Sequence, residues 1–109
     1  MAHYLMQASY SADAWTSLID NPQIRPEFVR PRVQALGGDI EGAWLSFDEY
    51  DVVLLLNMPD DVSAAAMSMA SSSGSHIKAV KITPLMNWET GLKALVEARV
   101  AVHPPPESA

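Results

Sequence analysis

Four polar residues stand among apolar neighbours in strand-like runs of this chain, and they are the first candidates for chemistry. They are Gln7, Asn57, Lys81 and Thr83. Because side chains alternate between the two faces of a strand, we expect all four on one face of a sheet. Polar groups scattered over an apolar concave face are typical of a ligand pocket, and we include Trp44 in the predicted ligand-binding set. A partly hydrated subunit interface has the same composition, so both interpretations stay open.

Lys81 is the most informative of these residues. A lysine that faces the inside of a barrel is desolvated and can meet an anionic ligand. We therefore expect a small anionic or polar-aromatic molecule as the partner of this face. If the strand is shifted in phase by one residue, Lys81 points at solvent instead.

A second set of residues could transfer protons. We predict that His3 meets Asp51 as a base with its orienting carboxylate, with Tyr50 beside them. In the alternative interpretation His3 is solvated, Asp51 accepts backbone N–H groups in a turn, and Tyr50 covers the end of the sheet. Neither a His-x-His nor an HExxH pattern occurs, so we expect no metal site and no cofactor.

The elements that must position these residues are four strands, expected at 3–10, 40–47, 52–58 and 77–85. The run 52–56 reads VVLLL and is too continuously apolar to have one face in water. We expect helices on one side of it and, in so short a chain, a second copy of the chain on the other. The turn 48–51 joins the second and third strands.

Helices are expected between the strands. Ser11, Asp60 and Asn87 are typical N-caps, and Gly37-Gly38 is a typical left-handed helix end. Pro26 and Pro31 force bends or a restart in the first helical region. The apolar positions at helical spacing are Trp15, Leu18 and Ile19, then Phe28, Val29, Val33 and Leu36, then Val62, Ala65, Ala66 and Met69, and finally Trp88, Leu92, Leu95 and Val96.

The element order β-α-β-β-α-β-α predicts an α+β, ferredoxin-like domain over 1–102 with strand order 4-1-3-2, followed by an extended Pro-rich tail over 103–109. Helices cover one face of this antiparallel sheet. The other face carries Leu5, Val53, Leu55 and Trp44, a patch that a monomer should not expose. Two such sheets packed face to face make a dimeric α+β barrel, so we expect a homodimer or a higher homo-oligomer.

Strand directions decide which residues meet at each end of the sheet. We infer that the first and third strands run in one direction and the second and fourth in the other. Two groups then gather at opposite ends: His3, Phe47, Tyr50, Asp51 and Thr83 at one end, and Tyr10, Asn57 and His76 at the other.

Composition narrows the class of protein. The chain has 109 residues, enough for one domain with a single core, and 49% of them are hydrophobic. A net charge of -6 without a basic stripe argues against a nucleic-acid partner. With no cysteine, no signal-peptide pattern and no membrane span in the sequence, we expect a cytoplasmic protein that has no membrane partner.

Four segments in this order and spacing resemble the GYD-domain family, which is named for a Gly-Tyr-Asp triplet in the turn between its second and third strands. The segments are 4–10 (YLMQASY), 36–38 (LGG), 49–53 (EYDVV) and 58–61 (MPDD). Here Glu49 replaces the glycine, so the turn needs either ordinary backbone dihedrals or a strained Glu49. The resemblance implies a ferredoxin-like dimeric barrel in a small prokaryotic protein. It supplies no catalytic residue.

Two classes of function follow from these observations. One is a small-molecule site inside the barrel, used for binding or for cofactor-independent isomerase, cyclase or monooxygenase chemistry, an analogy at the level of the fold. The other is a non-catalytic assembly module whose uncovered sheet serves oligomerisation. A closed pocket of several hundred Å³, either between the sheet and the helices or between two sheets, favours the first class. A barrel packed solid by Trp44, Leu55 and their partners favours the second.

Overall fold

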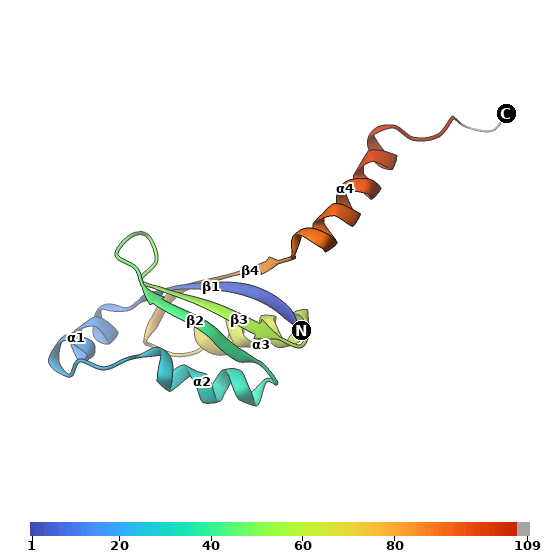
Figure 1. Cartoon of the computed structure of the whole chain (residues 1–109). Helices are drawn as coiled ribbons and strands as arrows, with labels where there is room; N and C mark the ends of the chain where they lie inside the picture. Colours follow the sequence, from blue (N-terminus) through green and yellow to red (C-terminus); the bar gives the residue numbers. More distant parts are fainter. Residues whose placement is uncertain (107–109) are drawn as a thin grey trace.

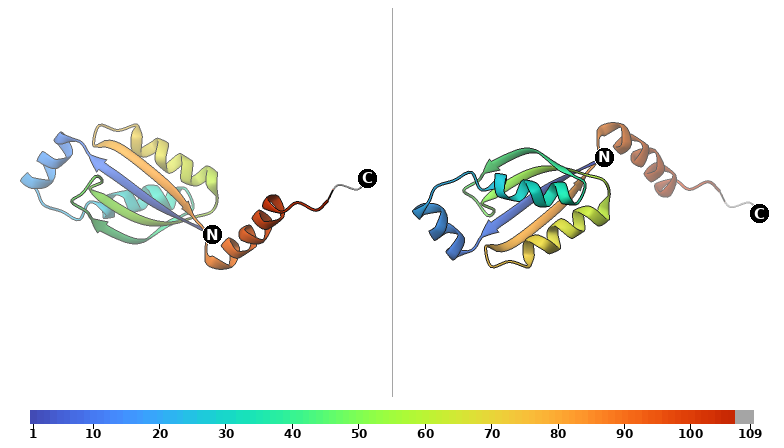
Figure 2. Two further views of the ribbon diagram at one scale, coloured as in Figure 1. Left: turned by 90° about the horizontal axis from the view of Figure 1, so that it is seen from above. Right: turned by 90° about the horizontal axis from the view of Figure 1, so that it is seen from below.

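The computed structural model describes residues 1–106 and contains four strands and four helices. In chain order they are β1 (Ala2–Tyr10), α1 (Ala12–Asp20), α2 (Pro26–Ala35), β2 (Asp39–Leu45), β3 (Val52–Met58), α3 (Asp61–Ser72), β4 (Ile77–Leu85) and α4 (Trp88–Val102). The strands form one sheet, and α1, α2 and α3 lie on the same side of it (Figures 1 and 2). This α+β, ferredoxin-like architecture confirms the predicted fold class.

The sheet has the strand order β2-β3-β1-β4, as predicted, and every neighbouring pair is antiparallel. The predicted strand directions are wrong, because β1 runs antiparallel to β3 rather than parallel to it. The helical crossover after β1 returns the chain into β2 in the direction of β1, and the tight β2–β3 turn then reverses it. The predicted end groups are therefore partly wrong: His3 lies at the same end as Asn57, whereas Asp51 lies at the other end with Tyr10 and His76, which were correctly placed together.

The core lies between the sheet and the helices. Alternate residues of the two central strands are buried there: Tyr4, Met6, Ala8 and Tyr10 from β1, and Val52, Leu54, Leu56 and Met58 from β3. Val33 of α2 and Met67 of α3 close this layer and are fully buried. The alternation along β1 and β3 leaves the intervening residues on the opposite face, which none of the four described helices covers (Figure 2).

The predicted helix ends are confirmed. The side chains of Ser11, Asp60 and Asn87 accept hydrogen bonds from the backbone N–H groups three residues later, at 3.2, 2.8 and 2.8 Å. The bonds from the Ser63 backbone and hydroxyl lower the pKa of Asp60. Gly37 follows α2 with a φ of +84°, a left-handed conformation that favours glycine.

The buried face of α3 differs from the prediction. Val62 and Met69 of the predicted stripe are 78% and 71% exposed, and Ala64, Met67 and Ser71 are buried instead. The hydroxyl of Tyr4 on β1 donates a short hydrogen bond of 2.5 Å to Asp61. Asp61 and the buried positions three, six and ten residues later thus lie along the side of α3 that faces the sheet.

The region predicted to bend at two prolines forms two separate helices. Pro26 stands at the first position of α2, where its missing N–H has no cost, and Pro31 lies inside the helix. Val29 and Leu36 are partly buried as expected. Phe28 is 63% exposed, because the Arg25 side chain rather than the sheet lies beside its ring, 6.0 Å from the ring centre.

Helix α4 projects away from the rest of the chain (Figure 1), and the molecule is elongated, with extents of 72 × 28 × 23 Å. The predicted apolar stripe of α4 packs against no other helix or strand of residues 1–106, since Trp88, Leu92 and Leu95 are all more than half exposed. After α4 ends at Val102, residues 104–106 form no regular structure, and the rest of the predicted tail lies outside the described residues. None of the helices in residues 1–106 has the length and apolar character needed to cross a membrane.

Candidate functional site

The uncovered face of the sheet carries all the predicted ligand-binding residues. Leu5, Val53 and Leu55 form its partly buried centre. The strand register places Thr83 opposite Leu5 and Lys81 opposite Gln7, so the phase predicted for β4 is correct. Asn57 and Trp44 share this face through their pairing with β1 and β3. The ligand-binding role of these residues stays a prediction.

The structure spreads these residues along the face rather than gathering them in one monomer cavity. Gln7 and Lys81 lie toward the end that carries the β2–β3 loop, because Gln7 pairs with Val53. Asn57 lies four residues further along β3, about 13 Å away at 3.3 Å per residue. Thr83 lies between the two ends. A single ligand would therefore have to extend along the sheet, or different residues meet different partners.

Gln7 and Lys81 share an open cleft of about 180 Å³ with the β2–β3 loop. Its other lining residues are Ser46, Asp48, Glu49, Tyr50 and Val53. Lys81 is exposed in the single chain. The lining contains two acidic residues beside one lysine, so the cleft offers both signs of charge to a polar molecule rather than a purely cationic site.

The loop over this cleft is fixed by hydrogen bonds to β1. The Asp51 carboxylate accepts from the Tyr10 N–H at 2.9 Å, and the Asp51 N–H donates to the carbonyl oxygen of Ala8 at 2.9 Å. Ser9 donates its hydroxyl to the Glu49 carbonyl oxygen at 3.1 Å. Glu49 itself has an ordinary negative φ, so the residue in the place of the motif glycine is not strained.

The predicted pairing of His3 with Asp51 is wrong. Asp51 lies at the end of the sheet where β1 finishes, and His3 lies at the end where β1 begins, opposite Asn57. His3 instead contacts Glu41 of β2, with Nε2 at 3.0 Å from a carboxylate oxygen. The two side chains are 50% and 38% exposed and belong to strands on either side of β3.

This contact depends on an irregularity in β2. The register between β2 and β3 shifts between Ile40 and Gly42, so Glu41 is an extra residue in the bulge. Asn57 of the intervening strand has a buried side-chain oxygen with no hydrogen-bond partner among residues 1–106. His3, Glu41 and Asn57 thus form a polar cluster that sequence reasoning missed. Gly42 within a strand was the available signal, since glycine there often marks a bulge.

Gly42 also determines the position of Trp44. A Cβ atom added at Gly42 would lie 2.5 Å from the indole ring of Trp44, so the ring lies directly over the glycine. The indole is 58% exposed on the uncovered face. The centre of this face therefore offers a flat aromatic and aliphatic surface between the two polar ends.

The site contains no evident metal centre. Within residues 1–106, no three His, Asp or Glu side chains gather closely enough to hold an ion. The face offers apolar groups at its centre, and hydrogen-bonding and titratable groups at its ends.

Comparisons with known proteins agree with the observed architecture. The model of the GYD domain family matches residues 4–95. A solved structure described as "crystal structure of FFRP-DM1" is similar with a TM-score of 0.53 and 9% sequence identity, over 79% of this chain and 100% of that one. No curated protein matches the chain in sequence.

Proposed function

Because this chain belongs to the GYD-domain family, with a ferredoxin-like α+β fold, we propose that it is a homo-oligomeric protein that binds a small molecule between paired sheets. The uncovered sheet face carries this proposal. Leu5, Val53 and Leu55 occupy its centre beside the exposed Trp44, whereas the other face of the same sheet is packed with helices. The same sheet face of a second subunit is an apolar surface that can cover it.

The energetics favour such pairing. Removing apolar surface from water contributes about 25 cal/mol per Å², and an apolar patch of this kind on a soluble protein marks an interaction site. The polar residues at the two ends of the face can orient a bound ligand through hydrogen bonds. Each dry, unpaired polar group would cost about 1–3 kcal/mol, so Gln7, Lys81 and Asn57 need water, a subunit or a ligand as partner.

The experiment that tests this proposal is native mass spectrometry of the protein purified from its own host, because it reports stoichiometry and retained ligand together. A dimer or larger oligomer that carries additional small-molecule mass supports the proposal. A bare oligomer would favour the non-catalytic assembly module. A species of 11.9 kDa at micromolar concentration would contradict both.

The His3–Glu41 contact favours a second candidate function, proton transfer without a cofactor. A histidine held at 3.0 Å by a carboxylate is a general base with its orienting group, which isomerase or cyclase chemistry uses. The unpartnered Asn57 oxygen beside them could accept a hydrogen bond from a substrate. Glu41 thereby takes the orienting role that was predicted for Asp51.

This second function is testable before a substrate is known. A panel of small C–H-acidic carbonyl compounds can be incubated with the protein in D₂O, and deuterium incorporation followed by NMR. His3→Gln and Glu41→Gln should both lower incorporation, and Glu97→Gln on the projecting α4 is the matched control. Incorporation that is the same in all three variants would rule out the His3–Glu41 pair as the base.

A further inference from the structure

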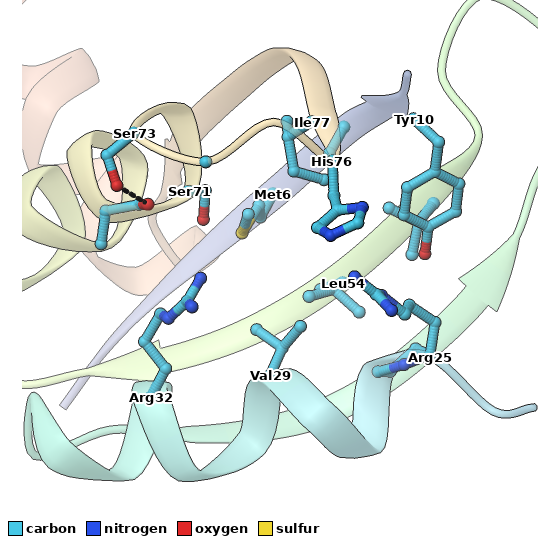
Figure 3. A pocket seen from close by; sticks show the side chains of 15 residues that line it. Met6, Tyr10, Arg25, Val29, Arg32, Leu54, Ser71, Ser73, His76 and Ile77 are labelled. Carbon is cyan, nitrogen blue, oxygen red and sulfur yellow. Dashed lines mark hydrogen bonds between the residues drawn. The ribbon is translucent and has the colours of Figure 1, made fainter. Parts of the chain in front are cut away.

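A second concave site lies on the helix-covered side of the sheet, apart from the face described above. It is a cleft of about 150 Å³ between α2, the end of α3 and the sheet (Figure 3). Its walls are mainly apolar side chains, among them Met6, Leu54 and Ile77. Met6 and Leu54 belong to the core and Ile77 packs against it, so the cleft connects the core to the outside.

The mouth of this cleft is cationic. Arg25, the N-cap of α2, precedes Val29 and Arg32 at the spacing i, i+4 and i+7, and all three residues line the cleft. His76 enters from the opposite side, in the loop between α3 and β4, and Figure 3 shows it directed toward the cleft together with the two arginines. The backbone of His76 is fixed because its carbonyl oxygen accepts from the Ser11 N–H at 2.9 Å.

The two arginines have no counterion in the part of the chain that the structure describes. No Asp or Glu lines the cleft, and among residues 1–106 neither Arg25 nor Arg32 has a carboxylate within 4.0 Å. Arg30 of the same helix differs, since it contacts Glu27 at 3.4 Å and Asp39 at 2.9 Å. In a chain with only seven Lys and Arg and a net charge of -6, two arginines without a carboxylate partner around one apolar cleft form a concentrated positive site, and His76 adds ring nitrogens for hydrogen bonding.

We propose that this cleft binds a small organic anion, with a carboxylate or phosphate head group at the Arg25, Arg32 and His76 rim and a compact apolar body against Met6 and Leu54. Guanidinium groups match the geometry of both head groups and bind them through charge-assisted hydrogen bonds. An apolar cavity of about 150 Å³ accepts a body of the size of benzene. The Tyr10 hydroxyl and the serines at the end of α3 add hydrogen-bonding groups to the lining.

This site is independent of the proposed function. It lies on the opposite side of the sheet from Lys81, so subunits paired through the uncovered face would leave it open. Substitution of Arg25 and Arg32 should abolish anion binding at this site, whereas Lys81→Met should leave that binding unchanged. The two sites can therefore succeed or fail separately.

The test is isothermal titration calorimetry of the full chain with benzoate and with phenyl phosphate. The matched neutral compound is benzyl alcohol, and acetate is the anion without an apolar body. The variant Arg25→Met/Arg32→Met removes both cleft arginines. The variant Arg30→Met/Arg99→Met makes the same change of charge outside the cleft and is the control.

We expect benzoate or phenyl phosphate to bind at least about ten-fold more tightly than benzyl alcohol or acetate, and the stronger of the two identifies the head group. The cleft double variant should weaken that binding by about ten-fold or more, while the control keeps it within about two-fold. Circular dichroism confirms that both variants are folded. No binding of either aromatic anion at millimolar concentration, or equal binding by the two double variants, would overturn the proposal.

Discussion

The carboxylate of Asp51 accepts a hydrogen bond from the backbone N–H of Tyr10 at 2.9 Å, which ties the loop between β2 and β3 to the last residue of β1. Asp51 thus satisfies a backbone donor of a neighbouring strand. The prediction that Asp51 accepts a backbone N–H group is correct, but the donor is Tyr10 of β1 and not a residue of the turn. The same bond explains why an aspartate follows the tyrosine at this point of the loop.

Asp51→Ala should lower the free energy of unfolding by about 1–2 kcal/mol, because the Tyr10 N–H would lose its acceptor. Urea denaturation measures the change. Asp48→Ala removes an exposed acid from the same loop and should leave stability within about 0.5 kcal/mol. Equal stability of Asp51→Ala and the wild type would mean that water replaces the carboxylate at no cost.

Leu55→Asp should dissociate the oligomer or unfold the chain, because the centre of a subunit interface cannot hold an unpaired charge. Sedimentation velocity at micromolar concentration measures the mass. Val62→Asp is the matched control, since Val62 is 78% exposed on α3, on the other side of the molecule. If Leu55→Asp keeps the wild-type mass and melting temperature, the subunits do not pair through this face.

Lys81→Met should abolish the thermal stabilisation that a bound small carboxylate or phenol produces at the uncovered face. The expectation follows from the position of Lys81 beside Gln7 in the cleft under the β2–β3 loop. A thermal-shift screen of wild type and variant measures it, with Lys78→Met as a control for loss of one positive charge from β4. A compound that stabilises Lys81→Met as strongly as the wild type binds elsewhere.

Gly37→Ala should destabilise the protein by about 1–2 kcal/mol, because an L-residue is strained at a φ of +84°. The added methyl group would also lie 3.0 Å from the Cγ atom of Pro59. Gly74→Ala provides the comparison, since no atom lies within 4 Å of its added Cβ and its φ is not positive. Similar melting temperatures for the two variants would contradict the left-handed assignment.

Stability should fall in strong alkali because of Tyr4. Its hydrogen bond to Asp61, its burial and the nearby negative charge raise the pKa of Tyr4 to about 12, above the ordinary value of 10.0. The unfolded chain then loses this proton first, so the contribution is complete below pH 10 and disappears as pH rises toward 12. Melting curves between pH 9 and pH 12 measure the slope, and Tyr4→Phe should flatten it. An unchanged slope in Tyr4→Phe would assign the effect to other groups.

The positions of the strands and helix ends followed from local signals. The bounds of β3 and β4 are those predicted, since VVLLL and the run after Ser75 have clear strand character. The predicted end of β2 at Phe47 lies two residues after the observed end at Leu45, because the aromatic Phe47 continues the strand-like composition after the sheet pairing stops. Ser11, Asp60 and Asn87 cap helices through contacts within four residues, which a sequence reveals directly.

Features that depend on distant contacts were not predictable in the same way. The buried face of α3 is the side that packs on the sheet, where Asp61 contacts Tyr4, 57 residues away, and the helix has small residues on more than one side. To predict the contact between His3 and Glu41, one needs the correct strand directions and the bulge before Gly42. The cationic cleft could not be predicted from local patterns, because it forms only where α2 and the α3–β4 loop face each other.

The position of Trp44 over Gly42 has a practical consequence for observing the protein in solution. The chain has three tryptophans, and each lies on a different surface. Trp44 is 58% exposed on the uncovered sheet face, Trp88 is 85% exposed at the start of α4, and Trp15 of α1 lies edge-on against Tyr10 at 5.4 Å. Variants that keep one indole at a time would therefore report separately, through the wavelength of their fluorescence, on the sheet face, the projecting helix and the helix-covered side.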